Sequence, residues 1–204
     1  MSMKILLTII VLTCFLGKAD SLGGQDQDQR KDPPVAFKDG SPKEVFQTFV
    51  AAAKKRDWDT WHQCLTPELE LYLCGGVVQF RKGPNLKNLN VNQPNPDPAT
   101  QWMIDYLKFL KKYDVGLGVH DREVRRKFVT NIDRTKFIKD FAKLMTGRNV
   151  PKQISENFWL FSGKAKLIND IKIDGEKAKG SAKFGNRKIS INFRDSGDGW
   201  RLDR

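Results

Sequence analysis

The sequence has few of the residues that hold metal ions or act as catalytic nucleophiles. It contains two histidines, His62 and His120, and three cysteines among 204 residues. His120 has no neighbouring ligand beyond Asp121, and no group of histidines and cysteines has the spacing of a zinc site. A phosphate-binding loop is missing, as is a serine or cysteine in a recognisable nucleophile motif. We therefore predict neither a metal nor a cofactor.

Long apolar runs are equally scarce, and the clearest one lies at the N-terminus. Residues 5–16 are almost wholly apolar, Lys4 precedes them, and Gly17-Lys18-Ala19 supplies the small residues of a signal-peptidase site. These twelve residues are too few to span a bilayer, which takes about 20. Residues 1–19 are thus predicted to be a signal peptide. The mature chain is expected to be secreted, or held in the periplasm or cell envelope, without a transmembrane segment.

Two alternatives concern the same N-terminal stretch. The segment could stay uncleaved as an anchor. Lipid attachment at Cys14 is not favoured, because Thr13 occupies a position where the lipoprotein peptidase normally takes a smaller residue.

Acidic residues are in deficit. The chain has 36 Lys and Arg against 24 Asp and Glu, a net charge of +12, and removal of 1–19 would take away Lys4 and Lys18 and leave +10. Such an excess favours anionic partners but does not define a fold. Export would also permit a disulfide. A helix over 67–74 would however separate Cys64 and Cys74 by roughly 10 Å, whereas a disulfide needs Cα atoms within about 7 Å. The distance argues against a Cys64–Cys74 disulfide but does not exclude it, so the pairing is left open.

The first half of the mature chain has the pattern of a polar tether followed by helices. Residues 20–40 are polar and are predicted to be flexible. Ser41 and Glu44 form a capping-box pattern, and later helix starts are marked by Asp or Thr, often just before Pro. Gly75-Gly76 is expected to end the third helix. The predicted helices cover residues 42–56, 58–65, 67–74, 98–113 and 134–146.

Residues 165–204 predict an antiparallel meander. Four short runs alternate apolar and polar residues, and glycine turns separate them. Residues 158–161 are predicted to be a strand that precedes these four. The chain is therefore predicted to be an α+β protein, with one domain over 41–204 in which N-terminal helices pack on a curved C-terminal antiparallel sheet. The apolar face of the meander is expected to comprise Ile171, Ile173, Ala178, Ala182, Phe184, Ile189, Ile191, Phe193, Trp200 and Leu202.

This order of elements resembles the nuclear-transport-factor-like superfamily of cystatin-like, cone-shaped domains, and in particular exported bacterial members of unknown function. The similar motifs are Ser41-Pro42 through Phe49, Asp57-Trp58, Leu65-Thr66-Pro67-Glu68, Asp170 through Ala178, Asn192-Phe193-Arg194 and Gly199 through Asp203. They cover roughly 41–75 and 165–204. An Asn- and Pro-rich stretch at 83–97 and a basic run at 122–127 depart from the family pattern. The resemblance implies a cone whose interior could hold a small apolar ligand.

Enzymes of this superfamily, such as ketosteroid isomerases and polyketide cyclases, place Asp, His or Tyr inside the cone. Here the inward positions of the predicted sheet are all apolar. Asp59 and His62, three residues apart on one helical face, are the candidate acid–base pair. The alternatives are an ordinary surface pair, or packing of His62 against Trp61 or Trp58. We therefore predict a non-catalytic binding or accessory domain, with an isomerase- or cyclase-type enzyme as the second hypothesis.

The polar face of the meander suggests a third hypothesis, binding of an anionic polymer of the cell envelope. An ordinary solvated sheet face, kept charged against aggregation, is the alternative. Nucleic acid is not favoured, because no aromatic residues are interleaved with the basic ones as stacking platforms. A homodimer is left open. The candidate residues are Lys179, Lys183, Lys188, Arg201, Arg122, Arg125 and Arg126.

Overall fold

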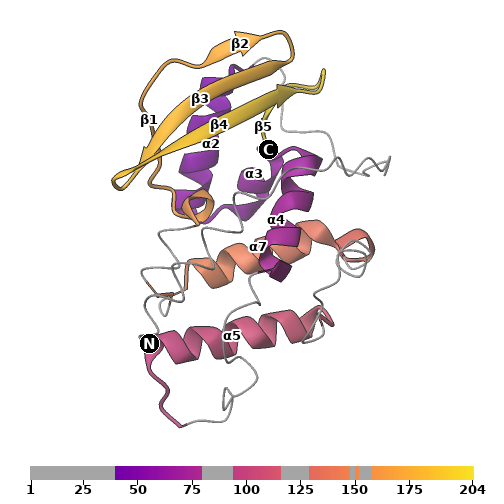
Figure 1. Cartoon of the computed structure of the whole chain (residues 1–204). Coiled ribbons are helices and arrows are strands. Elements are labelled where there is room, and N and C mark those ends of the chain that lie inside the picture. Colours follow the sequence, from indigo (N-terminus) through magenta and orange to yellow (C-terminus); the bar gives the residue numbers. More distant parts are fainter. Residues whose placement is uncertain (1–39, 80–93, 116–128, 148–149, 152–157) are drawn as a thin grey trace.

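The computed structural model describes residues 40–79, 94–115, 129–147, 150–151 and 158–204. Helices occupy the N-terminal half, and a curved, open antiparallel sheet forms the C-terminal part (Figure 1). The α+β class predicted from the sequence is confirmed. The predicted signal peptide at 1–19, nearly all of the tether at 20–40, and the basic run at 122–127 lie outside the described residues. Among the described helices, none combines the length and apolarity that crossing a bilayer requires.

Most helices begin where a side-chain cap was predicted. Helix α2 (Pro42–Lys55) opens with a capping box, in which Glu44 N donates to Ser41 Oγ at 3.4 Å and Ser41 N donates to Glu44 Oε2 at 2.7 Å. Such caps satisfy amides that have no partner within the helix. Asp residues cap three further helices in the same way: α3 (Trp58–Gln63), α5 (Pro98–Lys112) and α7 (Arg134–Met145).

Helix α4 (Pro67–Gln79) corrects one prediction, because the chain continues through Gly75 and Gly76 as a helix. A glycine ends a helix when it adopts a left-handed conformation, and neither of these two does so. Each costs about 1 kcal/mol relative to alanine in a helix. Burial of Cys74 and Val77 on both sides of the pair offsets that cost.

The sheet has five strands: β1 (Lys166–Leu167), β2 (Lys172–Asp174), β3 (Lys177–Phe184), β4 (Arg187–Asp195) and β5 (Trp200–Asp203). β3, β4 and β5 are consecutive neighbours, and β1 and β2 both pair with β3 on its other side. Gly175 and Gly185, at φ 56° and 58°, make the tight turns that flank β3. Beyond β5, Leu202 N donates to Cys64 O at 2.7 Å and Thr66 N donates to Leu202 O at 2.8 Å. The β5 edge is therefore covered by backbone, while β1 and β2 form the opposite edge.

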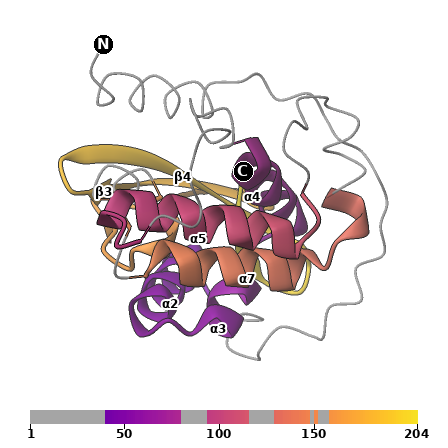
Figure 2. The ribbon, with the colours of Figure 1, turned by 90° about the horizontal axis from the view of Figure 1, so that it is seen from below.

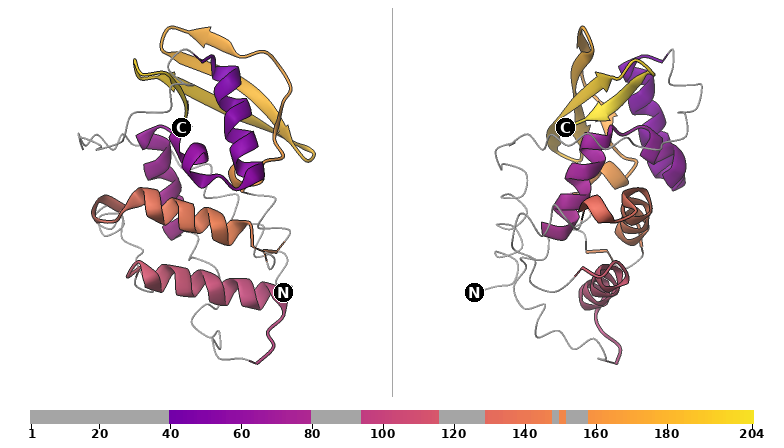
Figure 3. Two further views of the ribbon diagram at one scale, coloured as in Figure 1. Left: turned by 180° about the vertical axis from the view of Figure 1, so that it is seen from behind. Right: turned by 90° about the vertical axis from the view of Figure 1, so that its right-hand side faces the viewer.

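The helices cover only one face of the sheet. α2 lies across that face and contacts β5, and α3 and α4 follow it (Figure 3). α7 packs on α4 and α3, and α5 runs alongside α7 farthest from the sheet (Figures 1 and 2). Aromatic rings fill the junctions: Trp61 lies 5.5 Å from Phe49 and 5.0 Å from Phe161, centroid to centroid. Phe109 and Phe137 join α5 to α7 at 4.9 Å.

Two sheet predictions need correction. Residues 158–161 do not form a strand; Trp159–Phe161 is a 3₁₀ helix, η4. This run is apolar on every side, so it packs among the helices, and Leu160 O accepts a 2.9 Å hydrogen bond from Trp61 Nε1. Ile173 was expected to face the core but is 58% exposed. Helix α2 contacts β5, whereas β2 lies at the opposite edge of the sheet, so the helices do not cover Ile173.

Candidate functional site

The structure separates the candidate acid–base pair of α3. Asp59 projects outward with an 80% exposed side chain and forms an ion pair with Lys139 of α7. His62 turns into the protein and is 5% exposed. Although the two residues are one helical turn apart, their side chains have different partners. Asp59 and His62 therefore do not act as a unit.

His62 instead belongs to a buried cluster with Glu70 and Thr135, which joins α3, α4 and α7. His62 Nε2 lies 2.8 Å from Glu70 Oε1, and Glu70 is 2% exposed. The Thr135 hydroxyl donates to Glu70 Oε1 at 3.3 Å and lies at the same distance from His62 Nε2. Sequence analysis missed Glu70. Glu70 lies on the same helical face as Leu73 and Cys74, which are buried. This spacing could have indicated that Glu70 points into the protein.

The geometry of this cluster favours a structural role. An acid–base pair must reach substrate, within about 2.6–3.2 Å or through one water, and both ionisable side chains here are almost fully buried. The two surface grooves next to α2 are lined by other residues. The cluster links three helices and presents no charged atom to either groove.

The two described cysteines are also poor candidates for chemistry. Cys64 and Cys74 are free and buried, so they form no disulfide. Burial raises the pKa of the Cys64 thiol to about 12, and burial likewise raises the pKa of Cys74 well above its usual value. Since the thiolate is the nucleophile, both groups are inert at neutral pH.

The face of the sheet turned away from α2 presents a group of lysines, here called the lysine face. It consists of Lys172 on β2, Lys177, Lys179 and Lys183 on β3, and Lys188 on β4, all exposed. The register places Lys172 opposite Lys179 and Lys183 opposite Lys188. Residues opposite each other point to the same side of a sheet, so these side chains share one surface.

The charge of the lysine face is not neutralised among the described residues. None of its five lysines forms an ion pair with a described acid. The acids of the described strands on this face are Asp174, opposite Lys177, and Asp203, which already holds Arg194 at 2.9 Å. Like charges directly opposite each other destabilise a sheet. The face therefore keeps a repulsion that a bound anion would relieve.

The predicted basic residues fall into three groups. Lys179, Lys183 and Lys188 lie together on the lysine face. Arg201 is 7% exposed, and its Nη1 and Nη2 donate to the two carboxylate oxygens of Asp198 at 3.1 and 2.6 Å. Its charge is therefore already paired. Arg122, Arg125 and Arg126 lie outside the described residues.

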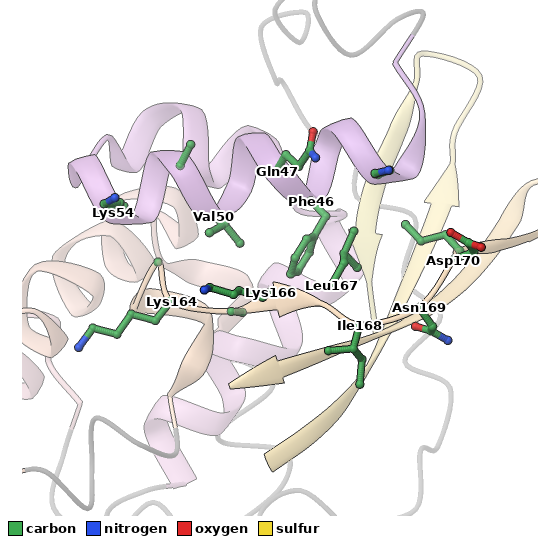
Figure 4. Close-up of a pocket in the computed structure, with 15 residues that line it drawn as sticks. Phe46, Gln47, Val50, Lys54, Lys164, Lys166, Leu167, Ile168, Asn169 and Asp170 are labelled. Carbon is green, nitrogen blue, oxygen red and sulfur yellow. The ribbon is translucent and has the colours of Figure 1, made fainter. Parts of the chain in front are cut away.

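A groove separates α2 from residues Gly163–Ile171 at the β1 edge (Figure 4). Its volume is about 750 Å³, within the range typical of ligand sites. Phe46 and Val50 of α2 point toward the β1 segment, and Phe46 lies beside Leu167. Four lysines stand around these apolar residues, at positions 43, 54, 164 and 166. Sequence patterns did not indicate this groove.

No family model, characterised protein or solved structure matches this chain. The resemblance to nuclear-transport-factor-like domains therefore stays a prediction. What distinguishes the described surface is its charge, concentrated on the lysine face and around the α2–β1 groove.

Proposed function

We propose that this chain is a non-catalytic binding domain whose lysine face holds an anionic polysaccharide. The observation behind the proposal is the cross-strand alignment of five exposed lysines on β2, β3 and β4 without an ion pair to a described acid. The proposal includes export to the outside or the cell envelope, for which the predicted signal peptide at 1–19 is the support.

The spacing of the lysines favours a polymer over a small anion. Strands lie about 4.8 Å apart, and alternate residues of a strand are about 6.8 Å apart. These separations are shorter than the screening length of about 8 Å at physiological ionic strength, so each ammonium group repels its neighbours. A chain of anionic groups relieves several of these repulsions together, whereas a single anion relieves one or two.

The composition of the same face favours a polysaccharide over nucleic acid. Single-stranded nucleic acid is held largely by bases that stack on aromatic side chains. The described residues between the lysines are Ser181, Ser190 and Asn192, which offer hydroxyl and amide groups but no ring. Hydroxyl and amide groups are suitable partners for sugar hydroxyls.

Heparin is a suitable probe, because it is a densely anionic polysaccharide. The test compares the purified protein with the triple variant Lys179→Gln/Lys183→Gln/Lys188→Gln. Each exposed charge contact contributes about 0.5–1 kcal/mol, and 1.4 kcal/mol is tenfold in affinity, so the variant should bind roughly 10–100-fold more weakly. The matched control removes three exposed lysines of the helices: Lys108→Gln/Lys111→Gln/Lys136→Gln.

The control variant has the same net charge as the lysine-face variant and should bind within about threefold of the unaltered protein, the small loss being long-range. Equal losses in the two variants would mean that heparin responds only to net charge, and the proposal would then be wrong. Circular dichroism and thermal melting of both variants check that the fold is kept.

A further inference from the structure

The sheet has one edge that the described residues leave open, and it faces the α2–β1 groove. At the other edge, β5 is hydrogen-bonded to the backbone of Cys64 and Thr66. At the β1 edge, Ile168 N donates to Ser181 O at 3.1 Å, so the backbone of Ile168 points toward β3. Backbone direction alternates along an antiparallel strand. The N–H and C=O of Leu167 therefore point away from β3, toward the open edge.

The opposite wall of the groove is one face of α2. Its lining residues recur at helical spacing, from Lys43 through Phe46 and Val50 to Lys54. The eleven steps from Lys43 to Lys54 correspond to about 17 Å of helix. An extended chain covers this length in about five residues. The groove thus has the length of a short extended peptide.

The two walls are held at a fixed separation. Gly163 has φ 60°, and a Cβ placed on it would lie 2.5 Å from the Lys54 backbone nitrogen. The chain leading into β1 is therefore in close contact with the C-terminal end of α2. Farther along, Ile171 lies so close to Gly180 of β3 that a Cβ there would be 3.0 Å from Ile171 Cγ1. Both ends of the β1 wall are fixed by packing, so the groove exists before any ligand arrives.

The side chains of the groove select for one kind of occupant. Lysines at 43, 54, 164 and 166 face a single acid, Asp170, among the lining residues. The half-buried Val50 and Leu167 form an apolar floor between them, with the buried Phe46 beneath. A ligand that fits this pattern carries negative charge on one side and apolar groups on the other. In an extended peptide, alternation of acidic and apolar residues has this effect.

We propose that the α2–β1 groove binds an extended peptide of alternating acidic and apolar residues, which adds to the sheet as a strand beside β1. The peptide backbone bonds to Leu167, its apolar side chains lie on the half-buried Val50 and Leu167, and its carboxylates meet the groove lysines. Main-chain bonds of this kind supply affinity, and the flanking side chains supply specificity. Of the groove lysines, those at 43, 54 and 164 lie outside the sheet strands, whereas Lys166 lies opposite Lys183 of the lysine face. The two proposals are therefore tested with variants at Lys43 and Lys164, which the polysaccharide proposal does not use.

The probe is the fluorescein-labelled peptide Glu-Val-Glu-Val-Glu-Val-Glu, with two matched peptides. In one, lysine replaces glutamate; in the other, serine replaces valine. Fluorescence anisotropy with the full chain should show binding of the Glu/Val peptide, with each matched peptide at least tenfold weaker. Amide exchange measured by NMR should show the Leu167 N–H slowed at least tenfold in the complex. Equal binding of the Lys/Val peptide, or an unchanged Leu167 amide, would overturn the proposal.

The variant Lys43→Glu/Lys164→Glu reverses charge at the two ends of the groove. Both residues are exposed, and a glutamate at position 43 is favourable in the first turn of α2, so the fold should survive. We expect at least a tenfold loss of Glu/Val peptide affinity. The control Lys108→Glu/Lys136→Glu has the same net charge and should stay within threefold. Equal losses in the two variants would contradict the site.

Two further results separate this proposal from other readings. The single variant Lys183→Glu, on the lysine face, should weaken heparin and leave the Glu/Val peptide within threefold. Loss of both ligands in that variant would mean one shared anionic surface instead of two sites. A further outcome is that the Leu167 amide becomes protected from exchange when the protein concentration is raised without peptide. That result would mean that a second copy of the chain occupies the edge, and the peptide proposal would be wrong.

Discussion

Removal of the Glu70 carboxylate should be among the most destabilising single changes in the helical part of the domain. Glu70 Oε1 lies 2.8 Å from His62 Nε2, and the two side chains are 2% and 7% exposed. Truncating one member of a buried ion pair lowers the free energy of unfolding by about 3–5 kcal/mol. Removing one partner of a neutral buried hydrogen bond lowers it by about 1–3 kcal/mol. We expect Glu70→Ala to lose about 1–5 kcal/mol, a substantial part of the 5–15 kcal/mol typical of a domain.

Urea unfolding followed by circular dichroism measures this loss. Glu70→Gln keeps the shape and an acceptor oxygen for Thr135 and His62, so it should lose less than Glu70→Ala. Asp59→Ala is the control, because its ion pair with Lys139 is exposed and such pairs contribute about 0–1 kcal/mol. A double-mutant cycle of Glu70→Ala with His62→Ala should give a coupling of at least about 1 kcal/mol.

Two results would refute this reasoning. One is a Glu70→Ala protein that unfolds within about 1 kcal/mol of the unaltered chain. The other is the absence of coupling between Glu70 and His62, which would mean that the close contact stabilises nothing. In either case the cluster would not be the structural link between α3, α4 and α7.

Three more predictions follow from single sites. Burial acts to raise the pKa of Asp140, but hydrogen bonds from Lys112, Tyr113 and Lys143 lower it from 3.8 to about 2. The ionised carboxylate of Asp140 therefore stabilises the folded state above pH 4, and this stabilisation is lost as the pH falls toward 2. Asp140→Asn should therefore cost at most about 2 kcal/mol at pH 6 and almost nothing at pH 2, as urea unfolding at both values would show. Gly163→Ala should lower thermal stability by at least about 1–2 kcal/mol, because the residue has φ 60° and lies against Lys54; an unchanged melting temperature would contradict that contact. Phe193→Ala should lower the free energy of unfolding by about 3–5 kcal/mol because Phe193 is 1% exposed. Trp200→Ala should lower it by less, because Trp200 is only half-buried; the reverse order in urea unfolding would mean that the core has been assigned wrongly.

Local sequence signals predicted the starts of the elements well and their ends less well. Ser41, Asp57, Asp97 and Asp133 each mark a helix start, because a cap is a contact between residues two or three positions apart. The end of α4 was predicted wrongly at Gly75-Gly76. Continuation of that helix depends on burial of Cys74 and Val77, which involves distant parts of the chain.

The candidate sites divide in the same way. The lysine face was predictable, because alternation along β3 and β4 decides which side chains share a side of the sheet. The partner of His62 was not, since Glu70 and Thr135 meet it only through the packing of α3, α4 and α7. The α2–β1 groove was also hidden, because it depends on the close approach of Gly163 to Lys54.

The salt dependence of heparin binding tests the proposed function most directly. Each lysine that neutralises a polymer charge releases a counterion and steepens the slope of log affinity against log salt concentration by somewhat less than one. The slope of the Lys179→Gln/Lys183→Gln/Lys188→Gln variant should be shallower than that of the unaltered protein by about two to three. The Lys108→Gln/Lys111→Gln/Lys136→Gln control should keep the original slope. Equal slopes for the lysine-face variant and the unaltered protein would contradict binding at that face.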